Sequence, residues 1–220
     1  MKTSMLGILL VTILGLCCCT TSNDVVNPNF PVADTWIVEA DYMSSDGEPT
    51  WKEHVYRLGA DTTIEGNVYH PIFRGVKYYG SIRYTNKFEK LFYHNGEKEY
   101  LLCDFTMKKN QRCEIYIGRS TSPKELNYLQ STLGGLTVPG KVLENKVVDG
   151  RHYVKIQFLS EEFESYGPIT MIQGIGSHSV VFSLAYPYEM DGAPGEFTRY
   201  AQKDDKTIYT FDLSAVGYQK

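Results

Sequence analysis

Long apolar stretches are scarce in this sequence, and the usual signatures of a specific chemistry are missing. The longest largely apolar run, Met5 to Leu16, has 12 residues, whereas a helix needs roughly 20 to cross a bilayer. The five histidines are dispersed, with no HxH or HExxH spacing, so we predict no metal site. No serine, histidine and carboxylate set and no pair of catalytic carboxylates can be defended, which argues against a hydrolase.

Concentrated positive charge is also lacking. The formal net charge is −4, and the basic residues stand singly or in pairs such as Lys108-Lys109. Nucleic acids demand a basic stripe or patch, so we exclude them as partners. The stretch Gln173 to His178, QGIGSH, lacks the GxxxxGK pattern of a phosphate-binding loop, and no other cofactor motif is present. Ser177 and His178 are adjacent, so in a strand they point to opposite faces.

The N-terminus carries the clearest targeting signal. Lys2 precedes the apolar run, and three cysteines follow it directly. A positive start and a short apolar segment predict an export signal. We therefore divide the chain into a signal peptide at 1–18, a flexible polar tether at 19–34 and a folded domain at 35–220.

Cys17, Cys18 and Cys19 resemble the lipobox of bacterial lipoproteins, in which a cysteine after the apolar run receives a diacylglycerol. We predict lipidation at Cys19, with Cys17 or Cys18 as alternatives. Two or more fatty chains give stable membrane anchoring, so we expect a lipoprotein of the cell envelope, in the outer membrane. The alternative is an ordinary signal peptide followed by free thiols.

From Trp36 onward the hydrophobic pattern has a period of two, which predicts half-buried strands. Asn95-Gly96 and Asp149-Gly150 separate apolar runs, and both predict hairpins. We expect further hairpins around Glu65-Gly66 and over 203–206. The chain has 17 tyrosines, which suit a pleated surface. The predicted fold is an all-β antiparallel meander that forms a sandwich or a partly open barrel.

One segment departs from this pattern. Ser122 is a candidate N-cap, Pro123 suits the first helical position, and Glu125 completes a capping box. We predict one short helix near 123–132.

Several phrases, taken in order, resemble a β-rich domain found in secreted and surface proteins of the Bacteroidetes. They are DTTIEGNVYHPI, IRYTNKFEKLFYHNGEKEYLLCDF, VVDGRHYVKIQF, MIQGIGS and FTRYAQKDDKTIY. The resemblance implies export and an accessory role, and it brings no catalytic residues. Such domains carry tryptophan and glutamate where this chain has Met171 and Gln173, and tyrosine in place of Cys103.

Cys103 and Cys113 are the only cysteines of the predicted domain. If the segment between them forms one hairpin, opposed positions bring the two residues within disulfide range, and an oxidising envelope favours the bond. The alternative is two buried free thiols on separate strands, because the strand register is not determined by the sequence.

Two further segments are candidate sites. Asp61 to Thr63 resembles the O-glycosylation sequon of Bacteroidetes, which makes Thr62 a candidate glycan acceptor. Residues 191–196 read DGAPGE, and this loop is a candidate for recognition. Its candidate residues are Asp191, Gly192, Pro194 and Glu196.

These observations favour a non-enzymatic binding module, anchored to the membrane by lipid, that contacts an envelope protein or a glycan. The alternative is an inhibitor of a secreted protease that inserts loop 190–196 into the active-site cleft. An uncharacterised hydrolase is the third hypothesis.

Overall fold

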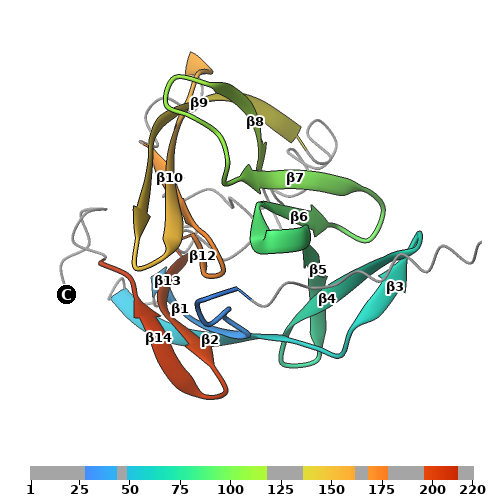
Figure 1. Cartoon of the computed structure of the whole chain (residues 1–220). Helices are drawn as coiled ribbons and strands as arrows, with labels where there is room; N and C mark the ends of the chain where they lie inside the picture. Colours follow the sequence, from blue (N-terminus) through green and yellow to red (C-terminus); the bar gives the residue numbers. More distant parts are fainter. Residues whose placement is uncertain (1–27, 44–48, 118–135, 162–167, 178–195, 213–220) are drawn as a thin grey trace, which may run out of the picture.

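The computed structural model of the chain describes residues 28–43, 49–117, 136–161, 168–177 and 196–212 (Figure 1). Apart from one short 3₁₀ turn, η1 (Asn86–Phe88), and the single helical residue Glu161, the regular structure of these residues is β-strand, so the predicted all-β class is confirmed. The helix predicted at 123–132 lies outside the described residues.

The larger sheet has nine strands. They follow the order β14-β13-β1-β2-β4-β5-β6-β7, and β3 pairs with the start of β4. Every pairing is antiparallel. The strands are β1 (Thr35–Met43), β2 (Pro49–Leu58), β3 (Thr62–Ile64), β4 (Asn67–Arg74), β5 (Lys77–Tyr84), β6 (Lys90–His94), β7 (Glu99–Asp104), β13 (Glu196–Lys203) and β14 (Lys206–Thr210).

The smaller sheet has five antiparallel strands in the order β12-β11-β10-β9-β8. Figure 1 shows the strands of the two sheets following one another around the molecule. Among the described residues no ladder joins the sheets, so these strands do not close into a barrel. The strands are β8 (Arg112–Ile117), β9 (Leu136–Val148), β10 (Arg151–Phe158), β11 (Ile169–Ile172) and β12 (Gly176–Ser177).

Turn chemistry explains the tight hairpins. In the β3–β4 turn, Glu65 and Gly66 have φ of 49° and 80°. In the β9–β10 turn, Asp149 and Gly150 have φ of 51° and 76°. Two successive positive φ angles are typical of the two-residue turns that match strand twist. These hairpins, and those joining β6 to β7 and β13 to β14, are confirmed.

Tyrosine rings fill the junction between β7 and β8, where the two sheets meet without a ladder. The rings of Tyr100 on β7 and Tyr116 on β8 are stacked, with centroids 4.1 Å apart. The ring of Tyr93 on β6 lies 5.5 Å from that of Tyr116. All three tyrosines are buried, so the high tyrosine content partly serves to pack one sheet against the other.

Residues 28–34, here called the N-terminal arm, hold the two sheets together on another side. The amide of Ala33 donates to the carbonyl of Gly174 at 2.8 Å, and Arg151 Nη2 donates to the carbonyl of Pro31 at 2.6 Å. At the start of β1, Trp36 Nε1 donates to the carbonyl of Ile175 at 2.6 Å. The folded part therefore includes residues at the end of the segment predicted as tether.

Candidate functional site

The larger sheet curls strongly between β4 and β7. The hydroxyl of Tyr69 on β4 donates a hydrogen bond to the carboxylate of Glu99 on β7, although β5 and β6 lie between these strands. In a flat sheet three strand spacings would separate β4 and β7 by about 14 Å. The contact therefore requires that the sheet bend toward this face, which we call the concave face.

Strand register places the side chains of the concave face. Ser81 pairs with His94, Arg83 with Phe92, Phe92 with Leu101 and His94 with Glu99. Since directly paired residues share a face, these side chains form one surface. The alternate residues, such as Ile82, Tyr93 and Tyr100, face the hydrophobic core.

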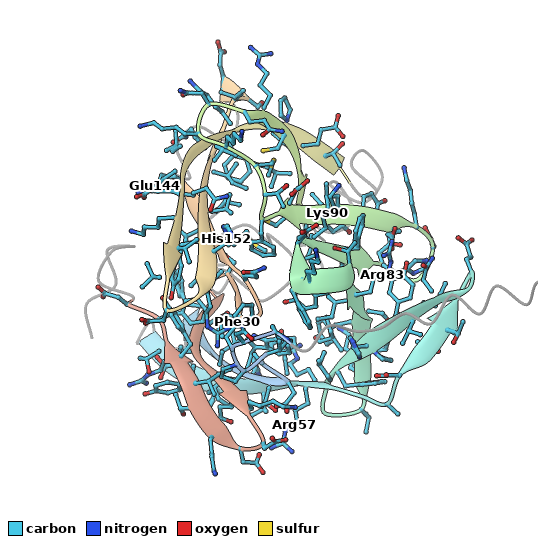
Figure 2. The ribbon with its side chains drawn as sticks, viewed as in Figure 1. Phe30, Arg57, Arg83, Lys90, Glu144 and His152 are labelled. Carbon is cyan, nitrogen blue, oxygen red and sulfur yellow. The ribbon has the colours of Figure 1, made fainter. Side chains whose placement is uncertain are left out.

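Arg83 lies at the centre of this face (Figure 2). Its Nε donates to Glu99 Oε2 at 2.6 Å and its Nη2 to Glu99 Oε1 at 2.8 Å, which makes a bidentate pair. The guanidinium lies 4.2 Å from the centroid of the Phe92 ring and 5.6 Å from that of Tyr69. We call Tyr69, Arg83, Phe92, His94 and Glu99 the Arg83 cluster.

The electrostatics of the cluster keep the ion pair charged. Burial alone would raise the pKa of Glu99, but hydrogen bonds from Arg83 and Tyr69 outweigh burial and hold that pKa below its usual value. Burial would lower the pKa of Arg83, and the hydrogen bonds to Glu99 and Tyr69 raise it instead. The pKa of Tyr69 is raised by burial and by its bond to Glu99. Tyr69 is therefore a neutral donor at physiological pH.

Ser81, His94 and Glu99 form a row across β5, β6 and β7, an order that suggests a nucleophilic triad. The hydrogen bonds contradict that assignment. His94 Nδ1 accepts the backbone N–H of Gly96 at 3.1 Å, so Nε2 carries the proton of the neutral ring and cannot accept one from serine. The Ser81 hydroxyl is buried and bonds that of Tyr78 at 2.9 Å. The row is structural.

The glycine-rich stretch after β11 is also structural. Gly174 and Gly176 have φ of 74° and 107°, which glycine adopts readily. The N-terminal arm covers this turn, and a Cβ on Gly174 would lie 2.8 Å from Phe30 Cε2. Ser177 is buried, and His178 lies outside the described residues.

The two cysteines of the domain do not share a hairpin. Cys103 on β7 pairs with Leu91 of β6, whereas Cys113 on β8 pairs with Gly140 of β9. Both are free thiols in this structure. The bond itself stays a prediction, and the two residues lie on separate strands. The reason is that the chain leaves the larger sheet after β7 and starts the smaller sheet with β8.

The other predicted site residues are only partly described. Thr62 is exposed at the start of β3, where its hydroxyl is accessible for modification. Glu196 is the first residue of β13. The lipidation candidates Cys17, Cys18 and Cys19 lie outside the described residues, as do Asp191, Gly192 and Pro194 of the candidate loop.

Metal ligands do not converge in the described ranges, where no three histidine, cysteine, aspartate or glutamate side chains come together. His70 Nδ1 and Asp61 Oδ1 lie 2.7 Å apart, which is a pair and not a set of three. Within the same ranges no helix is long and apolar enough to cross a membrane.

Sequence reasoning missed the Arg83 cluster. Its members come from four strands, and nothing in the spacing of an isolated arginine, glutamate and tyrosine indicates that they meet. The only signal is the two-residue alternation within the three strands that contain IRY, KLFYH and EKEYL. Once the register is known, this alternation places Arg83, Phe92 and Glu99 on one face.

Comparison with known proteins adds no relative: no family model, curated protein or solved structure matches this chain.

Proposed function

We propose that the chain is an exported protein, acylated at Cys19 or at the neighbouring Cys17 or Cys18, and held at the outer membrane of the cell envelope. Its β domain binds another macromolecule without catalysing a reaction. The proposal rests on the short apolar run that ends in three cysteines, because attached fatty chains give stable anchoring. The resemblance to Bacteroidetes surface domains agrees with an accessory role.

The observation that supports binding most directly is the concave face around the Arg83 cluster. The bidentate pair and the bond from Tyr69 fix the side chains of this face in advance, and a fixed surface loses little entropy when a partner binds. Beside the cluster, Leu101 is 38% exposed and pairs with Phe92. Apolar and aromatic groups next to satisfied polar groups suit a peptide or a sugar ring.

Anchoring is tested on the protein from its native envelope. Mass spectrometry of the N-terminal peptide should find a diacylglycerol on one of the three cysteines. Replacement of Cys17, Cys18 and Cys19 together by serine should release the protein from the membrane fraction. An unmodified N-terminus in the wild-type protein would contradict the proposal.

Binding is tested by screening the protein against purified envelope proteins and against glycans. Leu101→Ser should weaken the affinity for a partner that binds at the concave face about tenfold or more, as expected for an apolar contact within an interface. Val76→Ser is the matched control, since Val76 is fully exposed in the β4–β5 turn. If the protein binds nothing in either screen, or if both variants lose affinity equally, binding at this face is contradicted.

The protease-inhibitor alternative depends on loop 190–196, of which only Glu196 is described, so no specific observation favours it. No arrangement in the described ranges favours a hydrolase. In the row of Ser81, His94 and Glu99, the Nδ1 atom of His94 accepts a hydrogen bond from the Gly96 amide, so Nε2 is not free to accept the serine proton. Glycosylation of Thr62 stays a prediction, to be checked by the mass of its peptide.

A further inference from the structure

A second surface feature lies at the β8 edge of the smaller sheet, beside the loop that joins β7 to β8. Arg112 on β8 and Lys141 on β9 are directly paired, so two like charges face each other across the ladder. Such a pair is unfavourable for folding by itself. Lys108 and Lys109, both exposed, lie in the loop that leads into β8. We call these four residues the basic patch.

The loop that carries the two lysines is held rigidly against β9. The amide of Asn110 donates to the carbonyl of Val142 at 2.7 Å, and the amide of Val142 donates to the carbonyl of Gln111 at 2.9 Å. Both bonds continue the β8–β9 ladder past Arg112. The loop with Lys108 and Lys109 therefore lies beside the stretch of β9 that follows Lys141 and leads to Asn145.

Side chains fix the loop from beneath as well. Phe105 and Met107 are buried, and Asn145 Nδ2 donates to their carbonyls at 2.8 and 2.7 Å. Asn145 is held in turn by His152, whose Nδ1 lies 2.9 Å from Asn145 Oδ1. The positive charges are thus gathered by a preorganised backbone rather than by mobile chain.

Within the part of the chain that the structure describes, acidic groups balance the patch only in part: Glu114 follows Arg112 by two residues in β8, and Glu144 on β9 forms its ion pair with Lys146. None of its four cations forms an ion pair there, although other lysines and arginines of the domain do so, including Arg83 with Glu99 and Lys203 with Asp34. This concentration of charge is conspicuous in a chain of net charge −4. A partner with dense negative charge would be complementary to it.

We propose that the basic patch docks the domain onto the phosphate headgroups of an anionic lipid surface. The choice of a membrane rests on the proposed lipid anchor. The 11 Cα–Cα steps from Cys19 to Phe30 reach at most about 40 Å, similar to the diameter of a domain whose radius of gyration is about 16 Å. An extended tether therefore lets the domain turn toward the membrane over a wide range of orientations, and a basic patch adds electrostatic affinity to an acyl anchor.

The test measures co-sedimentation of the full chain with vesicles of phosphatidylcholine, with and without one-third phosphatidylglycerol. The chain is used unacylated and keeps its leader in every variant, so the contribution of the leader cancels. Each cation near such a surface contributes roughly fivefold, so Lys108→Glu with Lys109→Glu should weaken binding to anionic vesicles about 25-fold or more. The matched control is Lys77→Glu with Lys206→Glu, which changes the net charge equally at turns far from β8 and β9 (Figure 1).

We expect the control pair to change binding less than about threefold, and salt of about 1 M, where the Debye length is roughly 3 Å, to remove the preference for anionic vesicles. Equal binding to neutral and anionic vesicles, or equal loss in both double variants, would overturn the proposal. So would competition by millimolar inorganic phosphate, which indicates a soluble ligand, or a dimer that only the patch variant loses in sedimentation velocity.

Because acylation plays no part in this experiment, its outcome is independent of the anchoring test. If mass spectrometry finds no diacylglycerol, the proposed function is contradicted. If the Lys108→Glu and Lys109→Glu variant binds anionic vesicles as well as the wild type does, only the docking surface is contradicted. Thermal unfolding of each variant confirms that it is folded, and the exposed positions of Lys108 and Lys109 make both substitutions tolerable.

Discussion

The Tyr69 hydroxyl and the Glu99 carboxylate are hydrogen-bonded across two intervening strands. Arg83, on one of those strands, bonds both partners, with 3.3 Å between its Nε and the Tyr69 hydroxyl oxygen. This three-residue network ties β4, β5 and β7 together on the outside of the sheet, where the core does not reach. It therefore maintains the bend that creates the concave face.

Replacement of Glu99 by glutamine should lower the free energy of unfolding by about 2 kcal/mol, because it leaves the Arg83 cation without its counter-charge. The figure allows for solvent screening, since the Glu99 side chain is 29% exposed. Glu97→Gln is the control, because Glu97 is exposed in the β6–β7 turn. Urea denaturation measures both variants, and equal stability would show that the network is unimportant.

The contribution of Glu99 should depend on pH in a defined direction. Its pKa is lower in the folded protein than the value of 4.5 expected for the unfolded chain. The unfolded state therefore binds the proton more readily, so the stabilisation is complete above about pH 4.5 and is lost as the pH falls through the folded pKa. The stability difference between wild type and Glu99→Gln should be constant from neutral pH to about 5 and shrink below it. A difference that grows in acid would contradict this assignment.

Contact between Phe30 and Gly174 can be tested by coupling two substitutions. Phe30 lies under Arg151, with the guanidinium carbon 4.5 Å from the ring centroid. Gly174→Ala places a Cβ against the Phe30 ring in addition to straining a backbone at φ 74°. We expect a cost of about 3 kcal/mol alone and about 1–2 kcal/mol in a Phe30→Ala background, where the backbone strain and the 3.1 Å approach to Arg151 Nη1 remain.

Gly66→Ala supplies the reference for backbone strain, since its φ is 80° and a Cβ there meets nothing within 4 Å. Its cost should be the lower limit for that of Gly174→Ala in the Phe30→Ala background, where Arg151 Nη1 still lies 3.1 Å from the added Cβ. Purely additive costs for the two substitutions would mean that the arm does not pack on this turn.

The thiols of Cys103 and Cys113 should be inert in the folded protein. Burial raises the pKa of the Cys113 thiol to about 11 and that of Cys103 well above its usual value, so little thiolate is present at neutral pH. Iodoacetamide should modify both thiols at least about 100-fold faster in urea than in buffer. A native mass lower by two hydrogens, with no alkylation even in urea, would instead demonstrate the disulfide bond.

Local signals explain which features the sequence predicts. Asn95-Gly96 and Asp149-Gly150 turn where expected because the turn conformation depends on those residues themselves. Whether Cys103 and Cys113 share a hairpin depends instead on whether the strand after β7 joins the same sheet. β8 pairs with β9 in the smaller sheet, and this pairing is set by segments that are distant in the sequence. The same is true of the Arg83 cluster, because curl and register bring together side chains that are 30 residues apart in the chain, Tyr69 and Glu99.

The basic patch, likewise, could not be predicted from the sequence. Lys108-Lys109 is visible in the sequence as an isolated pair, whereas its neighbour Lys141 belongs to a strand that begins 27 residues after Lys109. Only the β8–β9 ladder reveals that these charges share one surface. Scattered basic residues in a sequence are therefore compatible with a local basic patch on the folded domain.

The N-terminal arm has a mechanical consequence. Any pull on the domain from its N-terminal side is borne first by the bonds from Ala33 to Gly174 and from Arg151 to Pro31, before tension reaches β1. Those bonds join the arm to the smaller sheet, while β1 belongs to the larger one. A pulling force would thus break the hydrogen bonds between the arm and the smaller sheet before it unfolds either sheet. The contact between the two sheets is therefore the first part of the domain to yield under force.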